Sequence, residues 1–178
     1  DQPRWRSDKK ISSSSEILPI LEKVAQSGHK DFVIIAEEVS GEALSLLVLN
    51  KLKGVFNSLV LKAPAFGDRR KEILEDIAVL TDAIVISEDK GMKLEDAEVS
   101  TLGSAKKIIA TKDSSTIISG AGKQSAVSDR IELIKSQANL ATSDYDREQY
   151  EKRAAALSGK VAVIKVGGAT ETEIDEKK

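Results

Sequence analysis

A short apolar run, FVIIA at residues 32–36, constrains the fold more than any other feature of this sequence. The run contains no polar residue, and three of its five members are β-branched, which favours extended backbone over helix. Uninterrupted apolar runs of this length are typical of strands that other elements cover. The sequence therefore predicts a buried strand, which needs further layers packed on it.

Patterns typical of helices and strands alternate around this run. Before it, apolar residues recur at helical spacing from Ile17 to Val24, after four serines that are candidate caps and before Gly28. After it, the patterns predict a helix at 42–53, a strand at 59–61, a helix that starts at Asp68 and carries Ile73, Leu74, Ile77 and Leu80, and a strand at 83–86. The alternation predicts an α/β fold in which helices cover a sheet, and it leaves the strand order open.

The C-terminal half predicts a hairpin followed by two helices. In chain order, these elements are a β-hairpin at 106–118, a helix at 125–140 and a helix at 144–157. Ser143 precedes the last helix and can cap its first turn. The run VAVIKVGG follows Gly159 and is strand-like, so we expect a second structural unit to begin near Lys160.

Composition excludes several classes of protein. The net charge is -2 with both signs interspersed, so no basic patch is available for nucleic acid. The chain has no cysteine and one histidine, which argues against disulfides, thiol catalysis and a metal site. No secretory signal and no apolar stretch of about 18 residues occurs, so we expect neither export nor a membrane span, and cytoplasmic residence fits.

Local patterns that resemble chemical motifs have simpler explanations. GAGK at residues 120–123 lacks the upstream glycine and the Ser or Thr of a phosphate-binding loop, so we expect a turn there. GDRRKE at residues 67–72 is explained by a helix start with solvated basic side chains, and His29 by a surface loop. The pair Asp144 and Asp146 suits a helix N-terminus. We therefore expect no catalytic residue, no metal site and no cofactor in this chain.

The second predicted helix is unusual because apolar residues surround nearly all of it: Ala43, Leu44, Leu46, Leu47, Val48, Leu49 and Leu52. A surface helix normally carries one apolar stripe, so a second face needs a cover. The apolar face of the first helix is also broad, since Leu18 and Leu21 lie beside the stripe of Ile17, Ile20 and Val24. Two interpretations stay open at this point: a fully buried second helix, or an exposed apolar groove that recognises another protein.

Several long segments resemble the GroEL-type, group I chaperonins in the order in which that family has them. They are DKKIS at 8–12, IIAEEVSGEAL at 34–44, KAPAFGDRRKEIL at 62–74, ATSDYDRE at 141–148 and VAVIKVGGATETE at 161–173. The resemblance implies an α/β, layered β/β/α apical domain with helices flanking the sheets, plus a short strand segment of the intermediate domain. It divides the chain into a segment outside the resemblance, residues 1–7, an apical polypeptide-binding domain, residues 8–159, and part of an intermediate domain, residues 160–178.

The resemblance also implies a function and a site. A chaperonin apical domain binds non-native polypeptides, and alternatively the mobile loop of a GroES-type co-chaperonin, in an apolar groove between two helices. Carried over by position, the groove residues are Leu18, Leu21, Leu44, Val48 and Leu49, with Asn50 at the groove edge. Gly159 is the implied hinge, and Glu171 is the implied contact to a neighbouring subunit in a ring of identical subunits.

Other positions depart from the family pattern. Ala65 stands where the family usually has glycine, and residues 1–7 do not resemble the strand expected before Asp8. The segments that bind and hydrolyse ATP have no counterpart in this sequence, so ATP and Mg are expected only in an intact parent, which would be an ATPase. The alternatives from other classes are a small α/β enzyme or regulatory domain whose second helix is core, and a structural oligomerisation domain.

The first prediction follows from the absent phosphate-binding loop. Titration of the chain with ATP in a calorimeter should give no saturable heat, because no glycine-rich loop of the required spacing is present to hold the phosphates. Saturable binding with a defined stoichiometry would contradict this expectation.

Overall fold

The computed structural model describes residues 2–6, 10–111, 114–159 and 161–164. Its helices are α1 (Ser14–Gln26), α2 (Gly41–Leu52), α3 (Gly67–Thr81), α4 (Gln124–Leu140) and α5 (Asp144–Ser158), with short 3-10 turns η1 (Glu88–Lys90), η2 (Leu94–Asp96) and η3 (Val99–Thr101). Its strands are β1 (Gln2–Arg6), β2 (Lys10–Ile11), β3 (Asp31–Ala36), β4 (Glu38–Val39), β5 (Asn57–Lys62), β6 (Gly103–Ala110), β7 (Ser115–Gly120) and β8 (Val161–Ile164).

The described strands form one large mixed sheet and one small sheet. The large sheet has six strands in the order β5-β3-β1-β6-β7-β8, and the small one pairs β2 with β4. Strands β1, β3 and β5 run parallel, whereas β6, β7 and β8 follow as antiparallel neighbours. The parallel half needs crossover helices on its faces, and the antiparallel half is built from direct connections and the α4–α5 helical hairpin.

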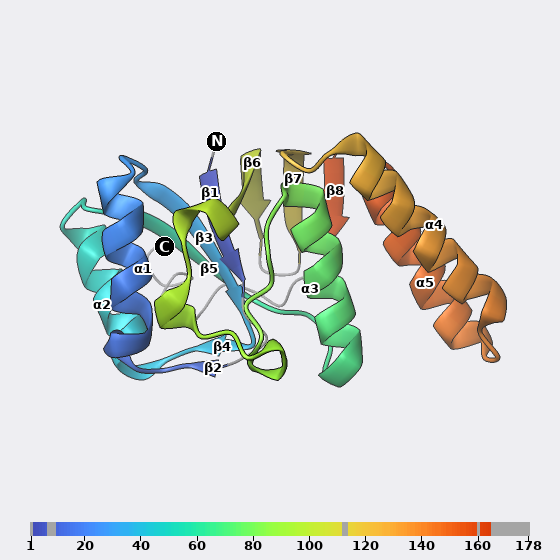
Figure 1. Ribbon diagram of the computed structural model, residues 1–178, viewed down its shortest axis with the longest axis horizontal. Coiled ribbons are helices and arrows are strands. Elements are labelled where there is room, and N and C mark those ends of the chain that lie inside the picture. Colours follow the sequence, from blue (N-terminus) through green and yellow to red (C-terminus); the bar gives the residue numbers. More distant parts are fainter. Residues whose placement is uncertain (1, 7–9, 112–113, 160, 165–178) are drawn as a thin grey trace.

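Strand β3 separates two apolar cores. Phe32, Ile34 and Ala36 belong to the core that α1 and α2 cover, whereas Val33 and Ile35 belong to the core that α3, α4 and α5 cover. Successive side chains of a strand point to opposite faces, so both faces of β3 are buried. Figure 1 shows β3 and β5 between the α1/α2 pair and α3, with α4 and α5 beyond α3. The predicted buried strand is therefore present and is covered on both sides.

Glycines at the end of β7 and just after it allow α3 to approach the sheet closely. A Cβ atom on Gly120 would lie 2.1 Å from the Leu80 carbonyl oxygen, and one on Gly122 would lie 2.1 Å from that of Val79. The Gly122 N–H donates to the Leu80 carbonyl at 3.1 Å. GAGK is thus a turn between a strand and a helix, as predicted, and its glycines serve the packing of α3.

The structure corrects three sequence-based expectations. Residues 83–86 form no strand beyond a single bridge at Ile86, although Val85 and Ile86 are buried. Phe66, and not Asp68, is the residue that precedes the first turn of α3. Residues 2–6, which resemble no family strand, form β1 within the large sheet. Among the described residues, helices cover one large sheet and the second sheet is a two-stranded pair, and the expected β/β/α layering stays a prediction.

The boundary expected near Lys160 is not a break in the sheet. Strand β8 follows Gly159 and pairs with β7 in antiparallel register, with Ile118 opposite Val161. Residues 165–178 lie outside the described residues. The division of the chain at residues 159 and 160 therefore stays a prediction about domains.

Gly120→Ala tests the close contact between α3 and the sheet. The added methyl group would meet the Leu80 carbonyl carbon and oxygen, which are backbone atoms and cannot rotate away. Overpacking of this kind costs about 1–3 kcal/mol, so urea denaturation should show a lower midpoint. The control is Ser104→Ala on β6, which adds no atoms. An equal decrease of the urea midpoint in both variants would contradict the explanation.

Candidate functional site

Helices α1 and α2 begin side by side because their preceding strands are paired. Strand β2 leads into α1 and β4 leads into α2, and the two strands are parallel with Ile11 opposite Val39. The Ala43 N–H donates to the Ser12 carbonyl at 3.1 Å, and the Ser14 hydroxyl donates to Glu42 Oε2 at 3.2 Å. The backbone therefore places the two helix N-termini together, independently of the apolar side chains farther along.

Helix α1 is capped by one of the four serines and buries one apolar stripe. Ser13 is its N-cap, and the Ser13 N–H donates to Glu16 Oε1 at 3.4 Å. The buried stripe consists of Ile17, Ile20, Leu21 and Val24. Leu18 lies off this stripe and is 43% exposed, so a large apolar side chain of α1 faces solvent.

Helix α2 is only partly covered. Among its residues, Ala43 and Leu47 are buried, which leaves the rest of its apolar circumference at least partly accessible. Leu44, Leu46 and Val48 are half-buried, whereas Leu49 is 48% and Leu52 is 72% exposed. A fully buried second helix, one of the two interpretations open from the sequence, is therefore not what this chain adopts.

Six exposed or half-buried apolar side chains, five of them on this pair of helices and one just after α2, define what we term the α1/α2 surface: Leu18, Leu44, Val48, Leu49, Leu52 and Val55. Leu44, Val48 and Leu52 follow each other at four-residue spacing and so lie along one face of α2. The two helices contact each other and lie together at one end of the molecule (Figure 1). Single exposed leucines are common on proteins, and it is the grouping of several on neighbouring helices that makes the α1/α2 surface the candidate site.

Asn50 is held by its own helix and by the turn that follows. Its side-chain amide donates to the Leu46 carbonyl at 2.8 Å. Its backbone carbonyl accepts the Val55 N–H at 3.0 Å, which brings Val55 back against the end of α2. The structure thus places Asn50 at the C-terminal end of the α1/α2 surface, where its side chain is half-buried.

Leu21 does not belong to the exposed surface. Its side chain is 2% exposed and packs in the core with Ile17 and Val24. The expectation that Leu21 lines an accessible groove is therefore wrong for this structure. The physical reason is helical geometry, because Leu21 lies four residues after Ile17 and three before Val24, on the face that meets the sheet.

The other two positions taken from the family resemblance have different outcomes. Gly159 follows α5 with φ -93° and ψ 158°, an extended conformation that any residue adopts. Its role as a hinge stays a prediction. Glu171 lies outside the described residues, so its contact to a neighbouring subunit stays a prediction as well.

A buried arginine near the start of α3 was not predicted from the sequence. Arg70 is 8% exposed, its Nη1 lies 3.1 Å from Glu37 Oε1, and its Nη2 donates to the Ala65 carbonyl at 2.6 Å. The interpretation of this basic segment as solvated is therefore wrong for Arg70. The helical spacing indicated this burial, because Arg70 precedes Leu74 by four residues and Ile77 by seven and so shares their buried face.

Ala65 adopts φ 59°, a left-handed conformation that favours glycine. Alanine is therefore strained at this position, where the family's glycine would not be. Arg70 holds this turn both through the Ala65 carbonyl and by lying 5.2 Å from the centre of the Phe66 ring. The segment supports the fold, and nothing in its geometry indicates catalysis.

The arrangement suits binding by apolar contact. Within the part of the chain that the structure describes, no group of three or more His, Asp or Glu side chains could hold a metal ion. No helix among the described residues is long and apolar enough to cross a membrane. What the α1/α2 surface offers a ligand is accessible leucine and valine side chains, with Asn50 at one end.

Comparison with known proteins supports a chaperonin-like fold. No protein-family profile matches the chain. A solved structure of the chaperonin gp146 from the bacteriophage EL 2 (Pseudomonas aeruginosa), determined with ATP-BeFx, is similar with a TM-score of 0.63 and 17% identity. The likeness covers 99% of this chain and 35% of that chain, so this chain spans about a third of the phage protein. The described chain therefore has a mixed α/β, chaperonin-like fold.

Substitutions at Leu21 and Leu18 should separate core from surface on the same helix. Leu21→Ala should lower the free energy of unfolding by about 2–5 kcal/mol because it opens a cavity in the core. Leu18→Ala should lower it by less than about 1 kcal/mol because the side chain is largely in water. Urea denaturation of both variants measures the difference, and equal losses would contradict the assigned burial.

Proposed function

We propose that this chain is the apical part of a GroEL-type chaperonin and binds non-native polypeptides through the α1/α2 surface. The observation that carries the proposal is the accessibility of Leu18, Leu49 and Leu52 on two neighbouring helices. The chaperonin-like fold and the family motifs in the sequence support it. The half-buried Leu44 and Val48 complete the surface, while Leu21 supports it from the core.

The energy available to this surface fits weak and unselective binding. Complete burial of a leucine or valine side chain contributes about 1.5–3 kcal/mol, so a half-exposed one has about 1 kcal/mol left to contribute. Ordering a ligand side chain costs about 0.5–1.5 kcal/mol and removes part of this gain. A single domain should therefore bind an unfolded segment weakly, and several domains in a ring would strengthen the binding through multivalency.

Apolar contact also explains tolerance toward different ligands. The hydrophobic effect is proportional to area and has no preferred direction, so any chain that presents apolar side chains can use the surface. Exposure of such side chains distinguishes a non-native protein from a folded one. The mobile loop of a GroES-type co-chaperonin would compete for the same leucines, and ATP hydrolysis with Mg in a longer parent protein would control release. In this proposal the chain itself is not an enzyme and works in the cytoplasm.

The test compares exposed leucines inside and outside the surface. Leu18→Ser and Leu49→Ser should each weaken binding of a fluorescently labelled, permanently unfolded protein about fivefold, as expected for a loss of about 1 kcal/mol. Both variants should keep their unfolding midpoints, because the side chains are already exposed. Fluorescence anisotropy and urea denaturation provide the two readouts.

The matched control is Leu140→Ser. Leu140 is 82% exposed at the end of α4, far from α1 and α2 (Figure 1), so it tests whether any exposed leucine contributes. Its affinity should equal that of the unmodified chain. Folded α1 and α2 variants with unchanged affinity would exclude the proposed surface, and self-association lost only in these variants would favour an oligomerisation domain.

A further inference from the structure

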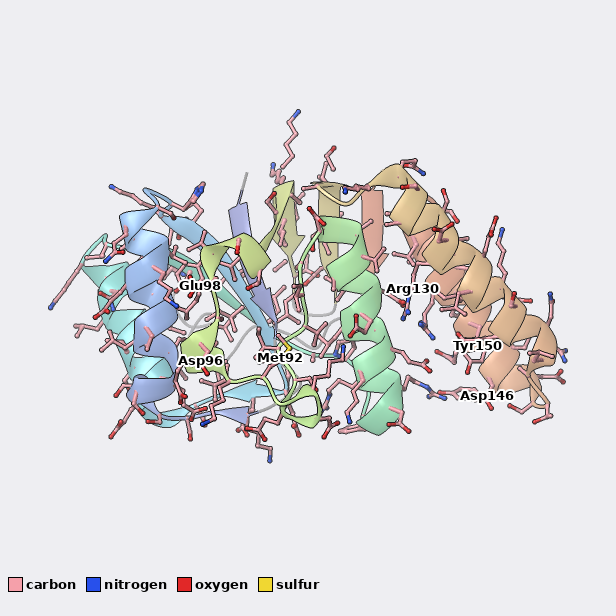
Figure 2. The ribbon with its side chains drawn as sticks, in the orientation of Figure 1. Met92, Asp96, Glu98, Arg130, Asp146 and Tyr150 are labelled. Carbon is pink, nitrogen blue, oxygen red and sulfur yellow. The ribbon has the colours of Figure 1, made fainter. Side chains whose placement is uncertain are left out.

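A buried cluster of charges joins the α4–α5 hairpin to α3. Asp76 of α3 accepts hydrogen bonds from Arg130 Nε at 2.9 Å and from Arg153 Nε and Nη2 at 2.7 and 2.9 Å. Arg153 Nη1 also donates to Glu72 Oε2 at 2.7 Å, and Arg130 Nη2 donates to the Glu72 carbonyl at 3.2 Å. Figure 2 shows Arg130 between α3 and the hairpin.

The cluster is balanced in charge, and its centre at Asp76 is shielded from water, whereas Glu72 at its edge is 37% exposed. Two arginines face two carboxylates, and the Asp76 side chain is only 6% exposed. Burial disfavours the charged form of Arg153, but its hydrogen bonds with Asp76 and the charge of that carboxylate outweigh this effect, so the pKa of Arg153 is raised. Each charge of this pair therefore has a hydrogen-bonded partner in a site where an unpaired charge would be costly.

Apolar packing between the hairpin and the rest of the chain is modest by comparison. The buried apolar side chains of residues 124–158 are Val127, Ile134, Ala138, Ala154 and Leu157, and the partly buried Ile131 and Tyr150 pack against the same core. Two of these are alanines, which have little surface to bury, whereas α4 and α5 contact each other along their length. Toward the tip, Leu140 and Tyr145 are exposed.

The tip has a weaker second connection to α3. Arg69 Nη2 lies 3.3 Å from Asp146 Oδ1, and Arg69 Nη1 donates to the Tyr145 hydroxyl at 3.1 Å. These side chains are about half exposed, so salt screens their attraction and the pair contributes little. The buried Asp76 cluster is therefore the main polar connection between the hairpin and α3 in the described structure.

The two ends of the hairpin attach to the sheet next to each other. Strand β7 ends at Gly120 before α4, and β8 begins at Val161 after α5. These strands are paired, with Ile118 opposite Val161, so both attachments lie at one edge of the sheet. A helical pair anchored on one side can turn away from α3 without breaking the sheet.

We propose that the α4–α5 hairpin is a separate opening unit and that Asp76 is the latch that holds it against α3. When the latch breaks, residues 124–158 leave α3 together, while β3 and α1 stay folded. Proteins open locally in cooperative units of this kind, and units with few buried apolar contacts open most readily. The proposal concerns a different part of the molecule from the α1/α2 surface and does not depend on its function.

Hydrogen exchange of the whole chain, resolved by peptide, tests the latch. Asp76→Asn keeps the size of the side chain but removes the charge that faces Arg130 and Arg153. Amides of residues 124–158 should exchange at least tenfold faster in this variant, with those of β3 and α1 changed less than twofold. The control is Asp144→Asn, which removes the exposed partner of Arg147 within the same hairpin and should change nothing.

Equal acceleration in β3 and in the hairpin would overturn the proposal, because it would mean that Asp76 stabilises the whole fold. Unchanged exchange in the hairpin would overturn it as well. If Asp76→Asn does not fold, hydrogen exchange of the unmodified chain in low urea tests whether the hairpin opens separately. The opening free energy of hairpin amides should then fall less steeply with urea than that of β3 amides, because a local opening exposes less surface. Equal slopes would overturn the proposal.

Discussion

Burial of β3 on both faces is the constraint on which the rest of the structure depends. Its alternating side chains supply one core to α1 and α2 and another to α3, α4 and α5, so neither group of helices could be stable without it. The sequence FVIIA meets this demand because every position is apolar. The candidate binding surface follows from the same constraint, since α1 and α2 use one face each to cover β3 and have apolar residues left over.

Local patterns were sufficient for most elements but not for the contacts between distant ones. The helical spacing around Ile17 and the glycines that end the first two helices predicted α1 and α2. Residues 2–6 do not resemble the family's strand, and they form β1 by pairing with both β3 and β6, which are distant in sequence. Asp76 could not be linked to Arg130 and Arg153 from the sequence, because 54 and 77 residues separate these partners.

The candidate site was likewise only partly predictable from local patterns. The excess of apolar residues on α2 left a buried helix and an exposed surface both open, and the structure shows Leu49 and Leu52 exposed. The position of Leu21 was taken from a resemblance, although its spacing from Ile17 and Val24 indicated the core. Which faces of two helices meet a sheet depends on how the whole sheet is arranged, and this is why a broad apolar face did not by itself identify its exposed members.

The paired strands β2 and β4 have a consequence for how such a surface can evolve. They bring α1 and α2 together through backbone hydrogen bonds, whereas the leucines that face solvent take little part in holding the helices in place. Exchange of these leucines for other apolar residues would alter which ligands are preferred while the scaffold stays intact. Selection could therefore adjust the range of ligands one side chain at a time, with stability largely preserved at each step.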